Sequence, residues 1–395
     1  MKHNNLSNLI FLGLLLVVFG VGVATFLKDK TLYSMAENRE LKGFEHFTWN
    51  SFVEGAFQDN FELALSDQFF GSEQIKVNYA QFINNLPTFG IKENICHNKY
   101  IELKGNDRRR GTFNCEEYIV YMPDPLTEEK KLIVELNIDK YNHVNRLTDV
   151  YYYFVDDPSS FDFEQKWRVN DYYGLLKKEL KGEKGLSRLN YNDFDGYKKF
   201  FYKNDHHWDY RGSYQGFIDV AKMLGIKNIV APTGEYTNHE NFFGSYARVT
   251  NTYDYPEEFI FYEFEIPKHK TYINGVEKKY NHFEEYKEHG YEYDRAMNYY
   301  AYVYGDDYAE IVFDFNQPRK KNLLVVSNSY SNAIDELVAQ YYDKTYVVDL
   351  RCYKETFGKD FEVSKYLLDK DIDEVLILMS PTFIWAEEPN RGLEL

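Results

Sequence analysis

Short apolar runs that alternate with helical segments near the C-terminal end constrain the fold of this chain most strongly. Strands are predicted at Asn322–Val326, Thr345–Leu350 and Glu374–Met379, and helices over Ala333–Tyr342 and around Phe361–Leu368. Strands of this kind, separated by helices, form mainly parallel sheets that are covered on both faces. The pattern therefore predicts an α/β fold.

The same alternation begins further upstream in the chain. Helices are predicted over Thr127–Leu147, Lys166–Lys181 and Tyr210–Leu224, and strands over Asp149–Val155 and near Arg188–Tyr191. Together with the C-terminal elements, they predict one α/β domain that extends over residues 126–395.

Two other segments interrupt or precede this domain. Between Ile226 and Phe315 the sequence is rich in Tyr, Phe, Thr and Gly with little helical periodicity, which predicts an antiparallel, β-rich insertion. Residues 31–125 are expected to form a stalk and entry segment with short strands. Cys96 and Cys115 flank a polar stretch there, so a hairpin closed by a disulfide and two unpaired thiols both fit the sequence.

The N-terminal residues 1–30 contain a long apolar run. Leu9–Leu27 comprises 19 uncharged residues, which as a helix would span about 28 Å, close to the hydrocarbon thickness of a bilayer. A cleaved signal peptide is the alternative, but the run is longer than a signal-peptide core and no small-residue cleavage site precedes Lys28. We therefore expect a single-pass anchor in the cell membrane, with the remaining chain outside the cytoplasm.

Composition limits the function classes. The 395-residue chain is 44% hydrophobic and 28% charged, which is typical of a globular protein. Its formal net charge of -17 argues against nucleic acid as a partner, because phosphate binding depends on clustered Lys and Arg.

A serine-rich turn is the first candidate for chemistry. Ser327–Asn332 follows a predicted strand and precedes a predicted helix, so it lies at the carboxyl end of a parallel strand, where open α/β sheets bind ligands. Backbone N–H groups in such a turn suit the oxyanion of acyl transfer, and Ser329 is the candidate nucleophile. Because Ser and Asn also cap helices, the turn by itself has a purely structural explanation as well.

The second candidate is the segment Asn204–Trp208. In an extended chain Asp205 and His207 share a face, while His206 points away. A carboxylate fixes the tautomer of an imidazole, whose free nitrogen then acts as a base towards a serine. We therefore expect His207 to be the base and Asp205 its partner, with Trp208 packed beneath the site.

The Asp-His-His-Trp sequence at 205–208, followed by Arg211 and Gly212, resembles the signature of the DHHW family of bacterial surface proteins. That family is similar to the SGNH-hydrolase-like domains of alginate O-acetyltransferase proteins. Short further matches extend the likeness over nearly the whole chain, at Glu37–Leu41, Asp67–Phe69, Phe243–Ser245 and Asp349–Arg351. The resemblance implies an SGNH-hydrolase-like (flavodoxin-like) fold and a triad of Ser329, His207 and Asp205. One departure from the family pattern is Ser327-Asn328, where a Gly-Asp pair would precede the nucleophile.

Two rival interpretations stay open. A metal site built from Asp205, His206 and His207 would use common ligand types, although adjacent ligands on an extended chain face opposite ways and the sequence has no HExxH motif. The other rival is a non-catalytic polysaccharide-binding or assembly protein on the same fold, which the departure at Asn328 keeps open.

The function expected from these residues is O-acyl transfer, by resemblance O-acetyl transfer, or ester hydrolysis on cell-envelope or exported polysaccharide. Ser329 would carry the acyl group as an ester, His207 would move the proton and Asp205 would hold the imidazole, without a metal or other cofactor. Candidates for substrate or oxyanion contacts are Arg211, Tyr330 and Asn332. The resemblance also implies a membrane-bound O-acyltransferase partner that delivers the acyl group.

Overall fold

A computed structural model shows two compact units. It describes residues 3–28, 30, 33–34, 39–44, 46–72, 74–75, 78, 102–103, 112–121, 126–157, 160–162, 167–168, 170–250, 252–280 and 298–394. The first unit takes its residues from 1–90, 103–110 and 248–252, and the second takes them from 91–102, 111–247 and 253–395.

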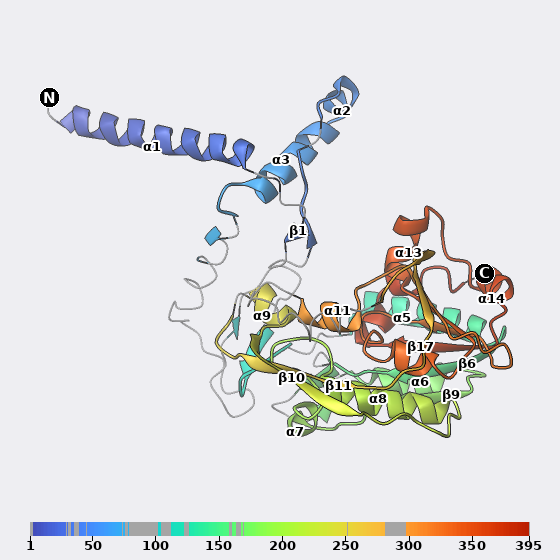
Figure 1. Ribbon diagram of the computed structural model, residues 1–395. Coiled ribbons are helices and arrows are strands. Elements are labelled where there is room, and N and C mark those ends of the chain that lie inside the picture. The colour runs from blue at the N-terminus through green and yellow to red at the C-terminus, as the bar shows by residue number, and fades with distance from the viewer. Residues whose placement is uncertain are drawn as a thin grey trace. The chain divides into compact units, whose positions relative to one another are not determined.

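The first unit is mainly helical. Its elements are α1 (His3–Leu27), β1 (Tyr33–Ser34), β2 (Arg39–Glu40), α2 (Trp49–Val53) and α3 (Ala56–Gln68). Among the described residues, only α1 is long and apolar enough to cross a membrane, over Asn8–Leu27. The predicted apolar helix is thus confirmed, and both an anchor and a signal sequence have this form. The end of α1 lies beside the end of α3 (Figure 1), because Thr25 Oγ1 accepts a hydrogen bond from the Phe70 N–H at 3.0 Å.

The second unit is built on an eight-stranded sheet with the order β13-β12-β14-β16-β15-β17-β6-β9. Its strands are β6 (Asp149–Phe154), β9 (Gly185–Arg188), β12 (Lys270–Ile273), β13 (Val276–Glu277), β14 (Glu310–Asp314), β15 (Leu323–Val326), β16 (Lys344–Val348) and β17 (Glu374–Met379). The strands from β16 to β9 run parallel, whereas β13, β12 and β14 form an antiparallel edge. The predicted α/β fold with a mostly parallel sheet is therefore confirmed.

Helices cover both faces of this sheet (Figure 1). One face packs against α5 (Glu128–Val144), α6 (Tyr172–Glu179), α13 (Leu350–Phe357), α14 (Val363–Asp369) and α15 (Pro381–Trp385), and the other against α8 (Tyr210–Met223) and α12 (Asp335–Ala339). Successive side chains of a strand point to opposite faces, so Leu323 and Val325 join the core beneath α8 while Leu324 and Val326 join the core beneath α5. Both cores exclude water from the strands that end at the candidate site.

Smaller elements lie between the strands and helices of the sheet along the chain. They are β3 (Glu102–Leu103), β4 (Thr112–Cys115), β5 (Tyr118–Tyr121), β7 (Phe161–Asp162), β8 (Trp167–Arg168), α7 (Phe194–Tyr197), β10 (Gly234–Phe242), α9 (Ser245–Thr250), β11 (Glu257–Glu263), α11 (Tyr299–Tyr304) and the 3-10 helix η3 (Glu388–Asn390). Strands β10 and β11 pair antiparallel, as predicted for residues 226–315. In the described part of that segment, β12 and β14 do not form a separate layer, because β14 pairs with both β12 and β16 and extends the central sheet.

Three helices differ from the sequence prediction for local reasons. The helix predicted from Lys166 begins at Tyr172, because the Asp171 side chain caps it by accepting the Gly174 N–H at 3.0 Å. Helix α12 is much shorter than the predicted Ala333–Tyr342, since turns occupy both of its flanks. Helix α13 was not predicted, although its Asp349 cap and the left-handed Gly358 at its end are recognisable signals.

The sequence left two alternatives for Cys96 and Cys115, a disulfide between them or two unpaired thiols. Cys115 is disulfide-bonded, so the alternative of unpaired thiols is wrong for this residue. Cys115 is buried on β4, whereas Cys96 lies outside the described residues. The pairing stays a prediction.

Candidate active site

The candidate nucleophile lies in the turn between β15 and α12. Ser329 follows the buried strand Leu323–Val326 and is half-buried. The turn is closed by a hydrogen bond from the Ser331 N–H to the Asn328 carbonyl oxygen at 3.0 Å. We expected the oxyanion to face a helix N-terminus directly after the serine, but α12 begins only at Asp335. The backbone amides of the turn itself are therefore the candidate oxyanion donors.

The loop that carries the histidines is bent, which corrects the prediction of an extended segment. Residues 203–207 form a series of bends between Phe201 and Trp208, which pair as an isolated antiparallel bridge. The Asp205 Oδ1 accepts the His207 N–H at 2.9 Å, and this local hydrogen bond turns the chain. As a result His206 does not point away: its ring centroid lies 3.7 Å from that of His207.

Asp205, His207 and Ser329 come together in a row. The Asp205 Oδ1 lies 2.6 Å from the His207 Nδ1, and the His207 Nε2 lies 2.9 Å from the Ser329 Oγ. Asp205 is 1% exposed and His207 is 4% exposed, so water does not compete for this contact. Because the carboxylate requires a proton on Nδ1, a neutral imidazole has its lone pair on Nε2, facing the serine hydroxyl. This arrangement can take a proton from Ser329.

Two tyrosines hold the imidazole in place. The Tyr300 ring stacks on His207 with centroids 3.7 Å apart and planes within 4°, and its hydroxyl donates to the Ser329 carbonyl oxygen at 3.2 Å. Tyr330 packs edge-on against His207 at 5.4 Å, and its hydroxyl donates to the His206 carbonyl oxygen at 2.5 Å. Tyr300 could not be predicted from the sequence, because it lies in an aromatic-rich segment with no motif around it.

A second segment of the chain supports the Asp205 carboxylate. Ser245 donates its N–H to Asp205 Oδ2 at 2.6 Å. The Asn204 side chain positions this segment, since it accepts the Gly244 N–H at 2.6 Å and donates to the Phe242 carbonyl oxygen at 3.2 Å. At Gly244 a Cβ would lie 2.2 Å from the Asp205 Cβ, so only glycine allows this approach. The Phe243–Ser245 match thus has a physical role beside Asp205.

The remaining predicted residues are engaged elsewhere. Arg211 pairs with Asp209, which caps α8. The Asn332 side chain donates to the Gly305 carbonyl oxygen at 2.8 Å. Trp208 has no exposed surface and packs in the core, so it cannot stack on a substrate. Among the described residues, no hydrogen bond joins the side chains of Arg211, Tyr330 or Asn332 to Ser329.

The three possible metal ligands also lie close together. One potential ligand atom each from Asp205, His206 and His207 lies within 4.8 Å of the others. The Nδ1 atoms are used already, that of His207 by Asp205 and that of His206 by the Ser245 Oγ at 2.6 Å. A metal ion bound through these Nδ1 atoms would have to replace both hydrogen bonds, so the geometry favours the proton-transfer interpretation.

A buried hydrogen-bond chain lies under the nucleophile turn. The hydroxyls of Ser327 and Ser331 lie 2.5 Å apart, and the Ser331 hydroxyl donates to Asp335 Oδ2 at 3.0 Å. Asp335 is 1% exposed. Burial raises the pKa of its carboxyl group to about 7, and the hydrogen bond from Ser331 opposes that shift only in part.

We expect the free energy of unfolding of Asp335→Asn, relative to that of the parent, to be higher at pH 8 than at pH 4. The folded protein holds the Asp335 proton more tightly than the unfolded chain, so its free energy of unfolding falls as the pH rises from about 4 to about 7. This fall in the free energy of unfolding is on the order of 2–4 kcal/mol in the parent. The asparagine variant has no carboxyl group at this position, so its stability does not fall in this way. Urea unfolding across this pH range measures it, with the exposed Asp369→Asn as the matched control. A difference between variant and parent that does not change with pH would contradict the expectation.

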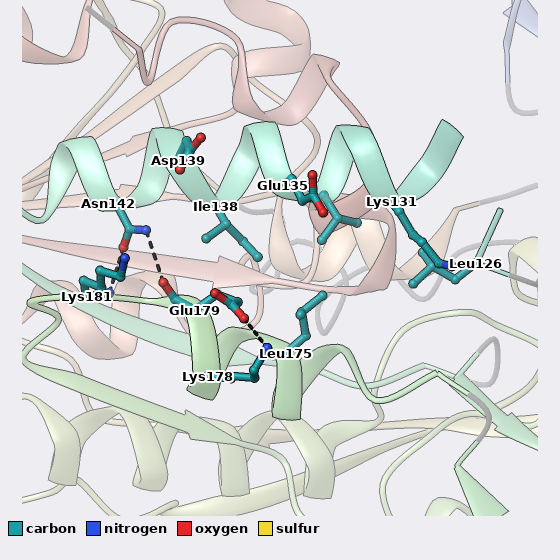
Figure 2. Close-up of a pocket in the computed structure, with 11 residues that line it drawn as sticks. Leu126, Lys131, Glu135, Ile138, Asp139, Asn142, Leu175, Lys178, Glu179 and Lys181 are labelled. Carbon is teal, nitrogen blue, oxygen red and sulfur yellow. Dashed lines mark hydrogen bonds and ion pairs between the residues drawn. The ribbon is translucent and has the colours of Figure 1, made fainter. Parts of the chain in front are cut away.

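A separate cavity lies between α5 and α6 (Figure 2). It has a volume of about 550 Å³, and its lining combines apolar side chains such as Ile138 and Leu175 with charged ones such as Asp139 and Lys178. The Asn142 side chain bridges the two helices by donating to the Glu179 carbonyl oxygen at 3.2 Å. None of the candidate site residues lines this cavity.

Comparison with known proteins gives structural likeness only. No protein-family model and no curated protein sequence matches the chain. A DHHW family protein from Eubacterium siraeum superposes with a TM-score of 0.50 and 16% identity, over 71% of this chain and 93% of that one. Bacillus cereus PatB1, solved with a sulfonyl adduct, superposes with a TM-score of 0.52 and 17% identity, over 70% of this chain and 97% of that one. The O-acetyltransferase domain of Pseudomonas putida AlgJ superposes with a TM-score of 0.37 and 10% identity, over 71% of this chain and 91% of that one. The chain therefore shares its fold with a DHHW family protein, as the motif at 205–208 predicts.

Proposed function

We propose that this protein is a membrane-anchored, SGNH-hydrolase-like serine O-acyltransferase that acts outside the cytoplasm on cell-envelope or exported polysaccharide. The observation that carries the proposal is the row of Asp205, His207 and Ser329, with a 2.9 Å contact between His207 Nε2 and Ser329 Oγ. A buried carboxylate, an imidazole and a hydroxyl in this order form the apparatus of acyl transfer on several unrelated folds.

In the first half of the reaction, Ser329 Oγ attacks the carbonyl carbon of an acyl ester. His207 Nε2 takes the hydroxyl proton, and the Asp205 carboxylate stabilises the imidazolium that forms. The backbone N–H of Ser329 is the proposed oxyanion donor, since no described hydrogen bond uses it. The imidazolium then protonates the leaving alcohol, and the acyl group stays on Ser329 as an ester.

In the second half, an acceptor hydroxyl attacks this ester. His207 removes the acceptor proton and returns it to Ser329 Oγ, so the acyl group moves to the acceptor and the enzyme is restored. A bound, oriented hydroxyl acts at an effective concentration of about 10⁵ M or higher, which favours transfer over hydrolysis. The aromatic-rich segment 226–315 is the proposed acceptor platform, and its Tyr300 already contacts both His207 and Ser329.

Membrane attachment is part of the proposal. Helix α1 is long and apolar enough to span a bilayer once. We propose that it is retained as an anchor, which would hold the active site near a membrane-bound O-acyltransferase partner that supplies acyl groups. A mature N-terminus near residue 30 would instead identify a cleaved signal sequence.

The full-length protein in detergent provides the test of transfer. It is incubated with 4-methylumbelliferyl acetate as donor and with envelope-derived oligosaccharides as acceptors, and acetylated sugar and free acetate are quantified by mass spectrometry. We expect acetylated sugar to exceed free acetate with the correct acceptor. Free acetate as the only product with every acceptor, at a rate that Ser329→Ala abolishes, would reject transfer and identify an esterase.

A further inference from the structure

An exposed aromatic cluster lies in the first unit, after the N-terminal helix. Phe47, Trp49 and Phe52 form it, and their ring centroids are 5.8 to 6.4 Å apart. Trp49 is 69% exposed, Phe47 55% and the adjoining Val53 68%. The rings contact one another and still face solvent. Contiguous apolar surface of this kind marks an interaction site.

The cluster is continuous with the end of the membrane helix. The Phe26 ring of α1 stacks on Phe44 at 4.9 Å, and Phe44 contacts Phe61 of α3 at 5.6 Å. From Phe61 the contacts continue through Phe57, at 5.9 Å, to Phe47, which lies 5.2 Å from Phe57. An unbroken series of rings therefore connects the C-terminal end of α1 to the cluster.

A hydrogen bond joins the same two regions. Thr25 Oγ1 accepts the Phe70 N–H at 3.0 Å, which ties the chain after α3 to the last turn of α1 (Figure 1). Both ends of the Phe44–Phe70 segment are thus attached to the point where α1 would leave the hydrocarbon. The segment cannot move far from that level while these contacts persist.

The residue types in the Phe44–Phe70 segment indicate that it contacts a lipid bilayer. Aromatic side chains, above all Trp, concentrate at the boundary between headgroups and acyl chains, where an apolar ring with a polar edge is stable. From Phe44 to Phe70 the sequence contains no Lys or Arg but contains five acidic residues, Glu45, Glu54, Asp59, Glu62 and Asp67. Lys30, whose Nζ lies 6.0 Å from the Phe44 ring, is the basic residue in contact with the segment. Because the charges within the segment itself are acidic, insertion of the rings is the main source of affinity.

We propose that the segment Phe44–Phe70 is a second membrane-contacting element, which lies on the bilayer surface with the aromatic cluster inserted at the headgroup boundary. This inference rests on the proposal that α1 is retained as an anchor. This second contact would fix the orientation of the residues that follow α1 at the membrane surface, because a spanning helix alone leaves them free to rotate about the membrane normal.

Trp49 provides a direct readout in the full-length protein. The protein is reconstituted alone into phosphatidylcholine vesicles whose acyl chains are brominated near the headgroup, and tryptophan fluorescence is compared with that in unbrominated vesicles. We expect strong quenching in the parent and loss of most of it in Trp49→Phe, which keeps an aromatic ring at the site. High salt and replacement of part of the lipid by phosphatidylglycerol should not increase the quenching.

The outcomes separate this inference from the anchor on which it rests. Resistance of the protein to alkaline carbonate washing of the vesicles reports only whether α1 is inserted in the bilayer. Protein that resists the wash but shows the same bromolipid quenching with and without Trp49 would overturn the inference and leave the anchor intact, and the cluster would then be a surface for a protein partner. Protein that is released by the wash would reject the anchor itself.

Discussion

Ser329→Ala is expected to lower the rate of acyl transfer by about 10³–10⁶-fold, because the variant loses the hydroxyl that is proposed to carry the acyl group. The serine hydroxyl donates into His207 Nε2 at 2.9 Å, and no other hydroxyl is in hydrogen-bond contact with that nitrogen among the described residues. An alanine leaves the turn intact, since the Ser327 hydroxyl bonds to the Ser331 hydroxyl, which donates to Asp335, and Ser329 takes no part in this chain. The unfolding temperature should therefore change little.

Covalent labelling separates loss of the nucleophile from loss of substrate binding. A sulfonyl fluoride reacts with activated serine hydroxyls. Mass spectrometry should find the adduct on the peptide that contains Ser329 in the parent and nowhere in Ser329→Ala. The half-buried Ser364 on α14 offers a matched Ser→Ala control that should retain both labelling and rate. Equal activity in the two variants would refute the assignment of Ser329 as the nucleophile.

Asp205→Asn is expected to lower kcat by about 10³–10⁴-fold with a small change in KM, a magnitude taken from the equivalent change in a serine protease triad. The Asp205 oxygens accept from three N–H groups, two of His207 and one of Ser245. An asparagine has one acceptor oxygen, so either orientation of its amide places an N–H₂ group against a donor. One orientation forces the His207 proton onto Nε2, where it can no longer accept from Ser329.

Asp209→Asn is the matched control for this variant. Asp209 is also buried and lies only four positions along the chain, but it caps α8 and pairs with Arg211 instead of contacting His207. Because asparagine also caps helices well, this change should reduce stability slightly and leave kcat near that of the parent. Steady-state kinetics and thermal unfolding of both variants make the comparison. The triad would be the wrong description if Asp205→Asn lost no more activity than Asp209→Asn.

Much of the fold was predictable because its signals are local. The strand Glu374–Met379 is apolar throughout and is buried throughout, so its sequence alone identifies it. Helix α5 begins after Thr127, whose hydroxyl accepts the Lys130 N–H as expected of a cap. The antiparallel pairing of β14 with β16 was not predictable, because strand pairing depends on partners far away in the chain.

The sequence by itself determined the apolar helix, the alternation that produces a mostly parallel sheet, and the placement of Asp205 two residues before His207. Each depends on residues within a few turns or strands of one another, so composition and periodicity are sufficient. Tertiary structure alone decided the 2.9 Å approach of Ser329 to His207, the stacking of Tyr300 and the support of Asp205 by Ser245. Those contacts join segments up to 122 positions apart, and only the folded backbone brings them within hydrogen-bond reach.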